Sequence, residues 1–178
     1  MGNDVSLISD KEVKRIAQFS ENDIRQLFAR FQQLDKDKSG SLDPQELLEV
    51  SNLKDNPLLA RVFSVFDTDG NAQISFLEFL VGIGRLSSAA ASEDKLKFLF
   101  EVYDFNNDGF VSNADLFNVM KIMVGDNISD VQLQQLVDRS IRNADKDGDG
   151  QLSFDEFSVA IGKLKIDTTV VAEMNVLT

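Results

Sequence analysis

Four acidic segments of twelve residues repeat one arrangement of oxygen-bearing side chains, and they begin at Asp35, Asp67, Asp104 and Asp145. In the first and fourth segments such side chains stand at positions 1, 3, 5 and 9, with glycine at position 6 and glutamate at position 12. Calcium is a hard cation that takes about six to eight oxygen ligands, and a loop between two helices supplies them at these positions and from the position-7 carbonyl. The repeat therefore predicts up to four calcium sites.

The first and fourth loops keep a ligand at every expected position, so we expect both to bind calcium. The predicted ligands of the first loop are Asp35, Asp37, Ser39, the Ser41 carbonyl, Asp43 and Glu46. The predicted ligands of the fourth loop are Asp145, Asp147, Asp149, the Gln151 carbonyl, Ser153 and Glu156.

The second loop departs from the pattern at position 6, where Ala72 replaces the glycine. The sharp turn there favours a positive φ, which costs an L-residue about 1–2 kcal/mol. We therefore expect a weakened site that still binds. Its predicted ligands are Asp67, Asp69, Asn71, the Gln73 carbonyl, Ser75 and Glu78.

The third loop departs at position 12, where Asp115 replaces the glutamate that normally gives calcium two oxygens. A carboxylate that is shorter by one methylene and reaches with one oxygen lowers the coordination number and favours magnesium. The alternative is that a small shift of the following helix preserves calcium binding. The predicted ligands are Asp104, Asn106, Asp108, the Phe110 carbonyl, Ser112 and Asp115.

These loops need helices on both sides, and apolar residues recur at helical spacing there. Ser20 is a candidate N-cap before the first loop, Pro57 suits a helix start before the second, and Ser129 with Gln132 forms a capping-box pattern before the fourth. The predicted fold is all-α, with four helix–loop–helix units paired into two lobes and a short antiparallel two-strand bridge in each. The bridges are expected at the apolar residues in position 8 of the loops: Leu42, Ile74, Val111 and Leu152.

Composition divides the chain into five parts. Residues 1–19 form an N-terminal arm, residues 20–83 the first lobe and residues 93–165 the second lobe. Residues 84–92 are small and polar and lack a helical apolar stripe, so they are the predicted linker. Residues 166–178 form a tail whose apolar side chains either pack on the chain or on a partner, or fray as a terminus.

The net charge of −12, from 18 basic and 30 acidic residues, makes nucleic acid an unfavourable partner. The chain has no cysteine and no histidine, which excludes disulfides, Cys–His and Ser–His catalytic pairs and histidine-bound zinc. No apolar stretch approaches the roughly 18 residues of a membrane span, and no signal-peptide pattern is visible. We therefore expect a cytoplasmic protein, partly membrane-associated if its N-terminus is acylated.

Several segments are more specific than the loop pattern. The N-terminal MGND and the runs NPLLARVFSVFDTDGN, MVGDNISDVQLQQLVDRSI and NADKDGDGQLSFDEF closely resemble the calcineurin B family of the EF-hand superfamily. The resemblance covers nearly the whole chain. It implies a non-catalytic regulatory subunit that grips an amphipathic helix of a calcium- and calmodulin-activated Ser/Thr protein phosphatase. It also implies a surface for immunophilin–drug complexes at Met120, Met123, Val124 and Asn127.

The N-terminus fits the N-myristoylation pattern, because Met1 and Gly2 are followed by Ser6. Gly2 is the predicted acceptor, and the alternative is ordinary removal of the methionine with nothing attached. One acyl chain binds membranes only marginally, so any membrane contact would be weak.

Two other functions fit a chain with four such loops: a free-standing myristoylated calcium sensor of the recoverin type, and a calcium buffer without a target. The chain has 14 phenylalanines and only 4 methionines. Methionine-rich surfaces suit promiscuous binders, so a groove built mainly from phenylalanine and aliphatic residues favours commitment to one partner. A buffer needs no groove, and the segments that resemble calcineurin B favour the regulatory role.

Overall fold

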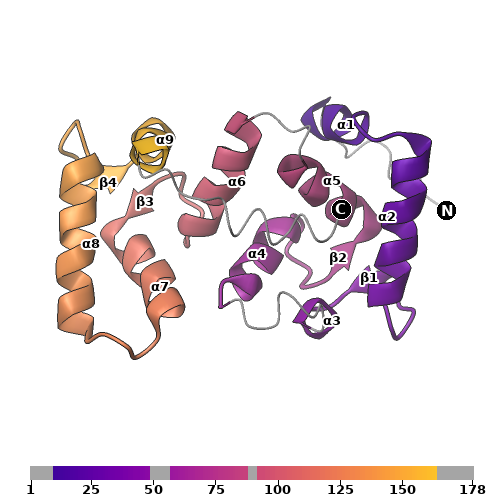
Figure 1. Cartoon of the computed structure of the whole chain (residues 1–178), viewed down its shortest axis with the longest axis horizontal. Coiled ribbons are helices and arrows are strands. Elements are labelled where there is room, and N and C mark those ends of the chain that lie inside the picture. Colours follow the sequence, from indigo (N-terminus) through magenta and orange to yellow (C-terminus); the bar gives the residue numbers. More distant parts are fainter. Residues whose placement is uncertain (1–9, 49–56, 88–91, 164–178) are drawn as a thin grey trace.

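The computed structural model describes residues 10–48, 57–87 and 92–163, which form helices joined by loops with short strands (Figure 1). The helices are α1 (Asp10–Ile16), α2 (Glu21–Leu34), α3 (Pro44–Leu48), α4 (Leu59–Phe66), α5 (Phe76–Leu86), α6 (Ser92–Tyr103), α7 (Asn113–Val124), α8 (Asp130–Ala144) and α9 (Phe154–Lys163). The strands are β1 (Ser41–Leu42), β2 (Ile74–Ser75), β3 (Val111–Ser112) and β4 (Gln151–Leu152). The predicted all-α fold is confirmed.

Each acidic loop lies between two helices and contains one of the strands. The loops join α2 to α3, α4 to α5, α6 to α7 and α8 to α9. β1 pairs antiparallel with β2 so that Leu42 lies opposite Ile74, and β3 pairs with β4 so that Val111 lies opposite Leu152. All four side chains are buried, which explains the apolar residue at position 8 of every loop. The predicted two-strand bridges are confirmed.

Reciprocal capping bonds begin several of the helices. At α2, the Ser20 hydroxyl accepts from the Asp23 N–H while the Asp23 carboxylate accepts from the Ser20 N–H. Ser129 and Gln132 exchange the same two bonds at α8. Both predicted caps are confirmed. Each satisfies backbone N–H groups that the first helical turn leaves without a partner. Pro57 lies instead in a turn before α4, which begins at Leu59.

The buried apolar side chains form two cores that meet at α6. Phe98 and Val102 belong to the core of the first lobe, whereas Leu99 and Phe100 belong to the core of the second. Figure 1 shows α6 lying between the two lobes. The helix that enters the third loop is therefore packed from both sides.

The segment predicted as a linker begins inside a helix. α5 continues to Leu86, which lies on the same face as Phe79 and Ile83 and is 1% exposed. α1 packs on α5, and the Gln18 side chain donates to the Gly84 carbonyl at 2.8 Å. Burial of this face extends the helix beyond the point that the small residues indicated, whereas the division into lobes at residues 83 and 93 stays a prediction.

Candidate metal centres

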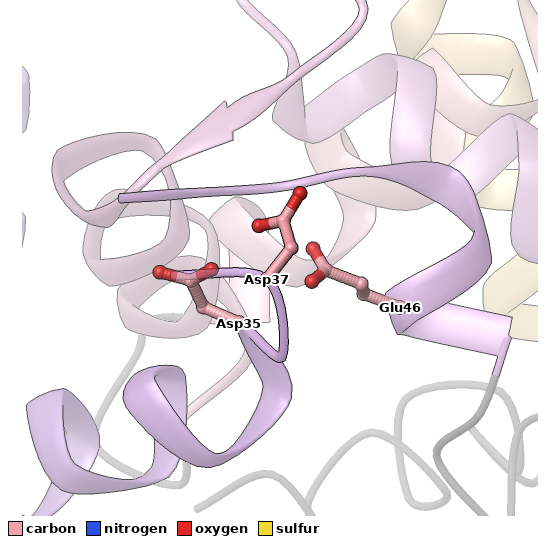
Figure 2. Close-up of side chains that lie close together, drawn as sticks. All are labelled: Asp35, Asp37 and Glu46. Carbon is pink, nitrogen blue, oxygen red and sulfur yellow. The ribbon is translucent and has the colours of Figure 1, made fainter. Parts of the chain in front are cut away.

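Acidic side chains converge at three of the four loops. Figure 2 shows three acidic side chains of the first loop lying close together. They are Asp35, which follows α2, Asp37 in the loop, and Glu46 of α3. Each offers a carboxylate oxygen within 4.8 Å of the others, and the same holds for two further sets. These are Asp67, Asp69 and Glu78 at the second loop, and Asp145, Asp147 and Asp149 at the fourth. Such groups of hard oxygen donors suit a divalent cation like calcium.

The aspartate at position 1 shapes each loop by accepting backbone bonds. Asp35 accepts from the N–H groups of Ser39 and Gly40, both at 2.9 Å. The same bonds to positions 5 and 6 recur in the second loop (3.1 and 2.8 Å) and in the third (3.1 and 2.9 Å). In the fourth loop Asp145 accepts from positions 4 and 6 (2.6 and 2.9 Å). The carboxylate that begins the loop is thereby held against it.

The glutamate at position 12 closes the loop by reaching back to both of its ends. Glu46 accepts at Oε1 from the position-2 N–H of Lys36 (2.8 Å) and at Oε2 from the position-9 N–H of Asp43 (3.0 Å). Glu78 repeats these two bonds, both at 2.9 Å, and Glu156 repeats them at 2.8 and 2.9 Å. Two separate oxygens are thus oriented by the backbone, as a ligand that gives two oxygens requires.

Asp115 behaves differently in the third loop. Its carboxylate accepts from the Ser112 N–H at 3.0 Å and from the Ser112 hydroxyl. Within the described residues it makes no bond to the position-2 N–H of Phe105, and no trio of acidic oxygens converges at this loop. Asn106 at position 3 also removes one acid from the set. The shorter side chain therefore leaves the third loop open where the glutamates close the others.

The backbone at position 6 takes the predicted conformation in every loop. Its φ is +86° at Gly40, +88° at Gly109 and +87° at Gly150. Ala72 occupies the left-handed region at +62°, so the second loop carries the strain expected of an L-residue there.

Position 4 has a positive φ as well, which sequence reasoning missed. It is +59° at Lys38 and +57° at Asn107, and glycines hold this position in the other two loops at +71° and +80°. The signal was available, because asparagine and glycine are the residues that tolerate this region best.

Hydrogen bonds lower the pKa of two position-12 glutamates, Glu78 and Glu156. The Lys146 N–H, and then the hydroxyl and N–H of Ser153, lower the pKa of Glu156 to about 2. Burial alone would raise the pKa of Glu78, but the bonds from Ser75 and Thr68 together outweigh it and lower the pKa. Both carboxylates are therefore anionic at neutral pH, which is the state that binds a metal.

An apolar groove lies in the second lobe between α7, α8 and α9, with a volume of about 480 Å³. Met120 and Met123, two of the four residues predicted for a partner surface, line it. Val124 packs instead against the core of the lobe, and Asn127 is exposed and donates to the Val124 carbonyl at 2.8 Å. The other main apolar lining residues are Leu116, Phe157, Val159 and Ile161.

Two predictions lie outside the described residues: acylation of Gly2 and packing of the tail at residues 166–178. In the part of the chain that is described, no helix combines the length and the apolar character needed to cross a membrane.

Comparison with known proteins agrees with this geometry. A model of the EF-hand domain pair matches residues 24–82 and 93–161, which contain the four loops. The chain is 47% identical to the type 2 calcineurin B protein of Mus musculus over 171 residues, covering 96% of this chain and 93% of the relative. It is 45% identical to the type 2 protein of Homo sapiens over 171 residues (96% and 98%). It is 48% identical to the type 1 calcineurin B protein of Dictyostelium discoideum over 165 residues (91% and 92%).

The chain belongs to the calcineurin B family. The resemblance seen in the sequence is thereby confirmed. As a calcineurin B protein with two EF-hand pairs, the chain binds calcium, and the converging carboxylates are the donors that such a cation takes. The ligand assignments of the individual loops stay predictions.

Proposed function

We propose that this chain is the calcium-binding regulatory subunit of a Ser/Thr protein phosphatase and holds an amphipathic helix of the catalytic subunit in the groove of its second lobe. The groove carries the proposal, because it keeps apolar side chains in contact with solvent. Met123 is 49% exposed and Val159 is 39% exposed. A partner helix that lays an apolar face into such a groove covers these side chains. The relatives' name, which makes each of them a subunit of calcineurin, supports the regulatory role.

We propose a graded set of metal sites. The first and fourth loops bind calcium most tightly, because their glutamates close them and glycine forms the turn. The second loop binds more weakly because Ala72 is strained. The third loop, where the Asp115 carboxylate bonds, among the described residues, to position 9 but not to position 2, binds calcium with fewer oxygens or takes magnesium.

Two further proposals follow from the resemblance to the calcineurin B family. Met120, Met123, Val124 and Asn127 lie on or just after α7 and are the proposed surface for immunophilin–drug complexes. Gly2 is the proposed myristoyl acceptor, which would give a cytoplasmic protein weak contact with membranes.

A free-standing sensor of the recoverin type is the second candidate, and the same groove would then receive a membrane target or a kinase. A buffer without a target is disfavoured, because exposing an apolar groove costs free energy and would bring such a protein no benefit.

The test uses the full-length chain to capture a calcineurin-type catalytic subunit, in calcium and in chelator. We expect Met123→Glu and Val159→Glu to weaken capture at least about tenfold, because each buries a charge beneath the partner helix. Val131→Glu is the matched control, since Val131 is 70% exposed and does not line the groove.

The outcomes separate the candidate functions. A partner that stays bound in chelator supports a stable regulatory subunit, whereas complete release in chelator favours the free-standing sensor. No capture in either condition would overturn the regulatory-subunit proposal and leave the sensor and the buffer as candidates. Equal weakening by Val131→Glu would contradict the groove as the docking site.

A further inference from the structure

The two lobes are joined through α6, the helix that enters the third loop. Phe98 of α6 stacks edge-on with Phe66 of α4, with ring centroids 5.9 Å apart. Phe66 is the last residue of α4 and directly precedes the second loop, just as α6 directly precedes the third. The helices that enter these two loops therefore pack on each other across the lobe boundary, as their places in Figure 1 indicate.

Arg61 of α4 binds the C-terminal end of α6. Its Nε donates to the Val102 carbonyl at 3.2 Å, and its Nη2 donates to the Glu101 carbonyl at 2.6 Å. The last carbonyls of a helix have no partner within the helix, and a cation at that end also opposes the negative pole of the helix dipole. Arg61 is 9% exposed, so these bonds form away from solvent.

The same guanidinium also binds two residues of the third loop. Nη2 also contacts the Asp104 carbonyl and donates to Oδ1 of Asn107 at 2.9 Å. Asp104 is position 1 of the loop, and Asn107 is position 4, where the backbone is left-handed. One side chain of the first lobe therefore holds both the beginning of the loop and its first turn.

Other side chains of the first lobe and its arm reinforce this contact. Arg85 of α5 pairs with Glu101 at 2.7 Å, and Arg15 of α1 pairs with Asp94 at 3.2 Å. These pairs are made to the side chains of α6 and not to the loop. Arg61 is therefore the arginine, within the described part of the chain, that joins the first lobe to the loop backbone.

We propose that Arg61 is a positioning residue for the third calcium loop and that it couples metal binding there to the first lobe, through α4 to the second loop. The third loop lacks a glutamate that closes it from within, and Arg61 supplies an equivalent constraint from outside. The proposal requires that the third loop binds a metal ion, and it is independent of any partner protein.

Charge and geometry act in opposite directions at Arg61, which makes them separable. Its cation lies near the carboxylates of Asp104 and Asp115 and repels an incoming calcium ion. Its planar fork holds the loop in a binding conformation. Arg61→Lys keeps the cation but loses the fork, because an ammonium group cannot reach several fixed acceptors in one plane. The lysine variant therefore isolates the geometric effect.

Tyr103 supplies a local signal. The chain has one tyrosine and no tryptophan, and Tyr103 is the last residue of α6, next to Asp104. The Tyr103 ring also packs on Phe157, which follows Glu156 of the fourth loop, with ring centroids 5.4 Å apart. Luminescence of terbium excited through tyrosine therefore reports on the two loops of the second lobe, and displacement of terbium by calcium gives their calcium affinities. An Asp115→Asn variant identifies the third-loop phase.

We expect Arg61→Lys to weaken metal binding at the third loop about tenfold, within the usual range of coupling between sites. Asn107→Gly should weaken it by a smaller factor, because it removes one acceptor while keeping a residue that tolerates positive φ. Arg25→Lys is the control, since Arg25 forms an exposed ion pair with Glu21, one turn away on α2. Thermal unfolding in chelator checks that each variant is folded.

The coupling itself is tested with Glu78→Gln, which disables the second loop. We expect this change to weaken the third loop in the wild-type background and to have less effect when Arg61 is lysine. Unchanged third-loop affinity in both Arg61→Lys and Asn107→Gly would overturn the positioning role. An equal effect of Glu78→Gln in both backgrounds would overturn the coupling through Arg61.

Discussion

The third and fourth loops share one lobe and one strand pair, yet they are held in different ways. Glu156 bonds to positions 2 and 9 of the fourth loop and closes it from within. Asp115 bonds only to Ser112 at position 9 of the third loop, among the interactions of the described residues. Arg61 of the other lobe holds the start of the third loop instead. The loop whose last carboxylate is shorter by one methylene is thus the loop that an arginine of the other lobe contacts.

The largest expected effect separates the two loops directly. Glu156→Gln should weaken calcium binding at the fourth loop by more than about a hundredfold, because loss of a ligand should exceed the 10–100-fold cost of losing a residue that only supports one. Asp115→Asn should weaken calcium binding at the third loop only about tenfold, because the shorter Asp115 gives the metal fewer oxygens than a glutamate does. Calorimetric titration of both variants measures the ratio, and equal losses would contradict the comparison.

The next effect comes from restoring the missing methylene. Asp115→Glu should let the carboxylate reach the Phe105 N–H, tighten calcium about tenfold and reduce competition by magnesium. Glu46→Asp is the matched reverse change and should make the first loop resemble the third. Competition titrations with both ions test this, and unchanged selectivity in both variants would show that chain length is not the deciding feature.

A smaller effect is expected at the second loop. Ala72→Gly relieves about 1–2 kcal/mol of left-handed strain but adds about 0.5–1 kcal/mol of backbone entropy in the unfolded chain. The expected net gain in the free energy of unfolding is about 0.5–1 kcal/mol in chelator. Ala29→Gly, at an exposed position within α2, should instead lose about 1 kcal/mol. Chemical denaturation of the two variants measures their free energies of unfolding. A lower free energy of unfolding in both variants would rule out strain at Ala72.

The smallest effect concerns Tyr103, which directly precedes the third loop, whereas Ala144 occupies the same position before the fourth loop. Burial raises the pKa of Tyr103 above its ordinary value of 10.0. Because the folded state disfavours the tyrosinate, the contribution of this group to stability is complete below that value and is lost as the pH rises through the raised pKa. The absorbance of tyrosinate should show the higher pKa in the folded protein, and Tyr103→Phe should remove that part of the alkaline loss of stability. Titration at the ordinary value would contradict burial at the end of α6.

Much of the fold followed from local spacing. The loops, the strand pairs at Leu42 and Val111, and the caps at Ser20 and Ser129 depend on residues that are close in sequence or on a repeated register, so the pattern predicted them. The positive φ of Ala72 followed from the loop template in the same way. The end of α5 at Leu86 was missed, because burial under neighbouring elements extends a helix through residues of poor helical pattern.

The sequence by itself determined the chemistry of this protein: four sets of oxygen donors, their two departures at Ala72 and Asp115, and membership of the calcineurin B family. Ligand spacing within twelve residues is a local property, and a local property can be recognised from the sequence alone. Only the tertiary structure decided that α6 serves both cores and that Arg61 binds the carbonyl of a residue 41 positions away. Nothing in a lone arginine between apolar residues indicates which helix end it will meet, because that choice depends on how the two lobes pack.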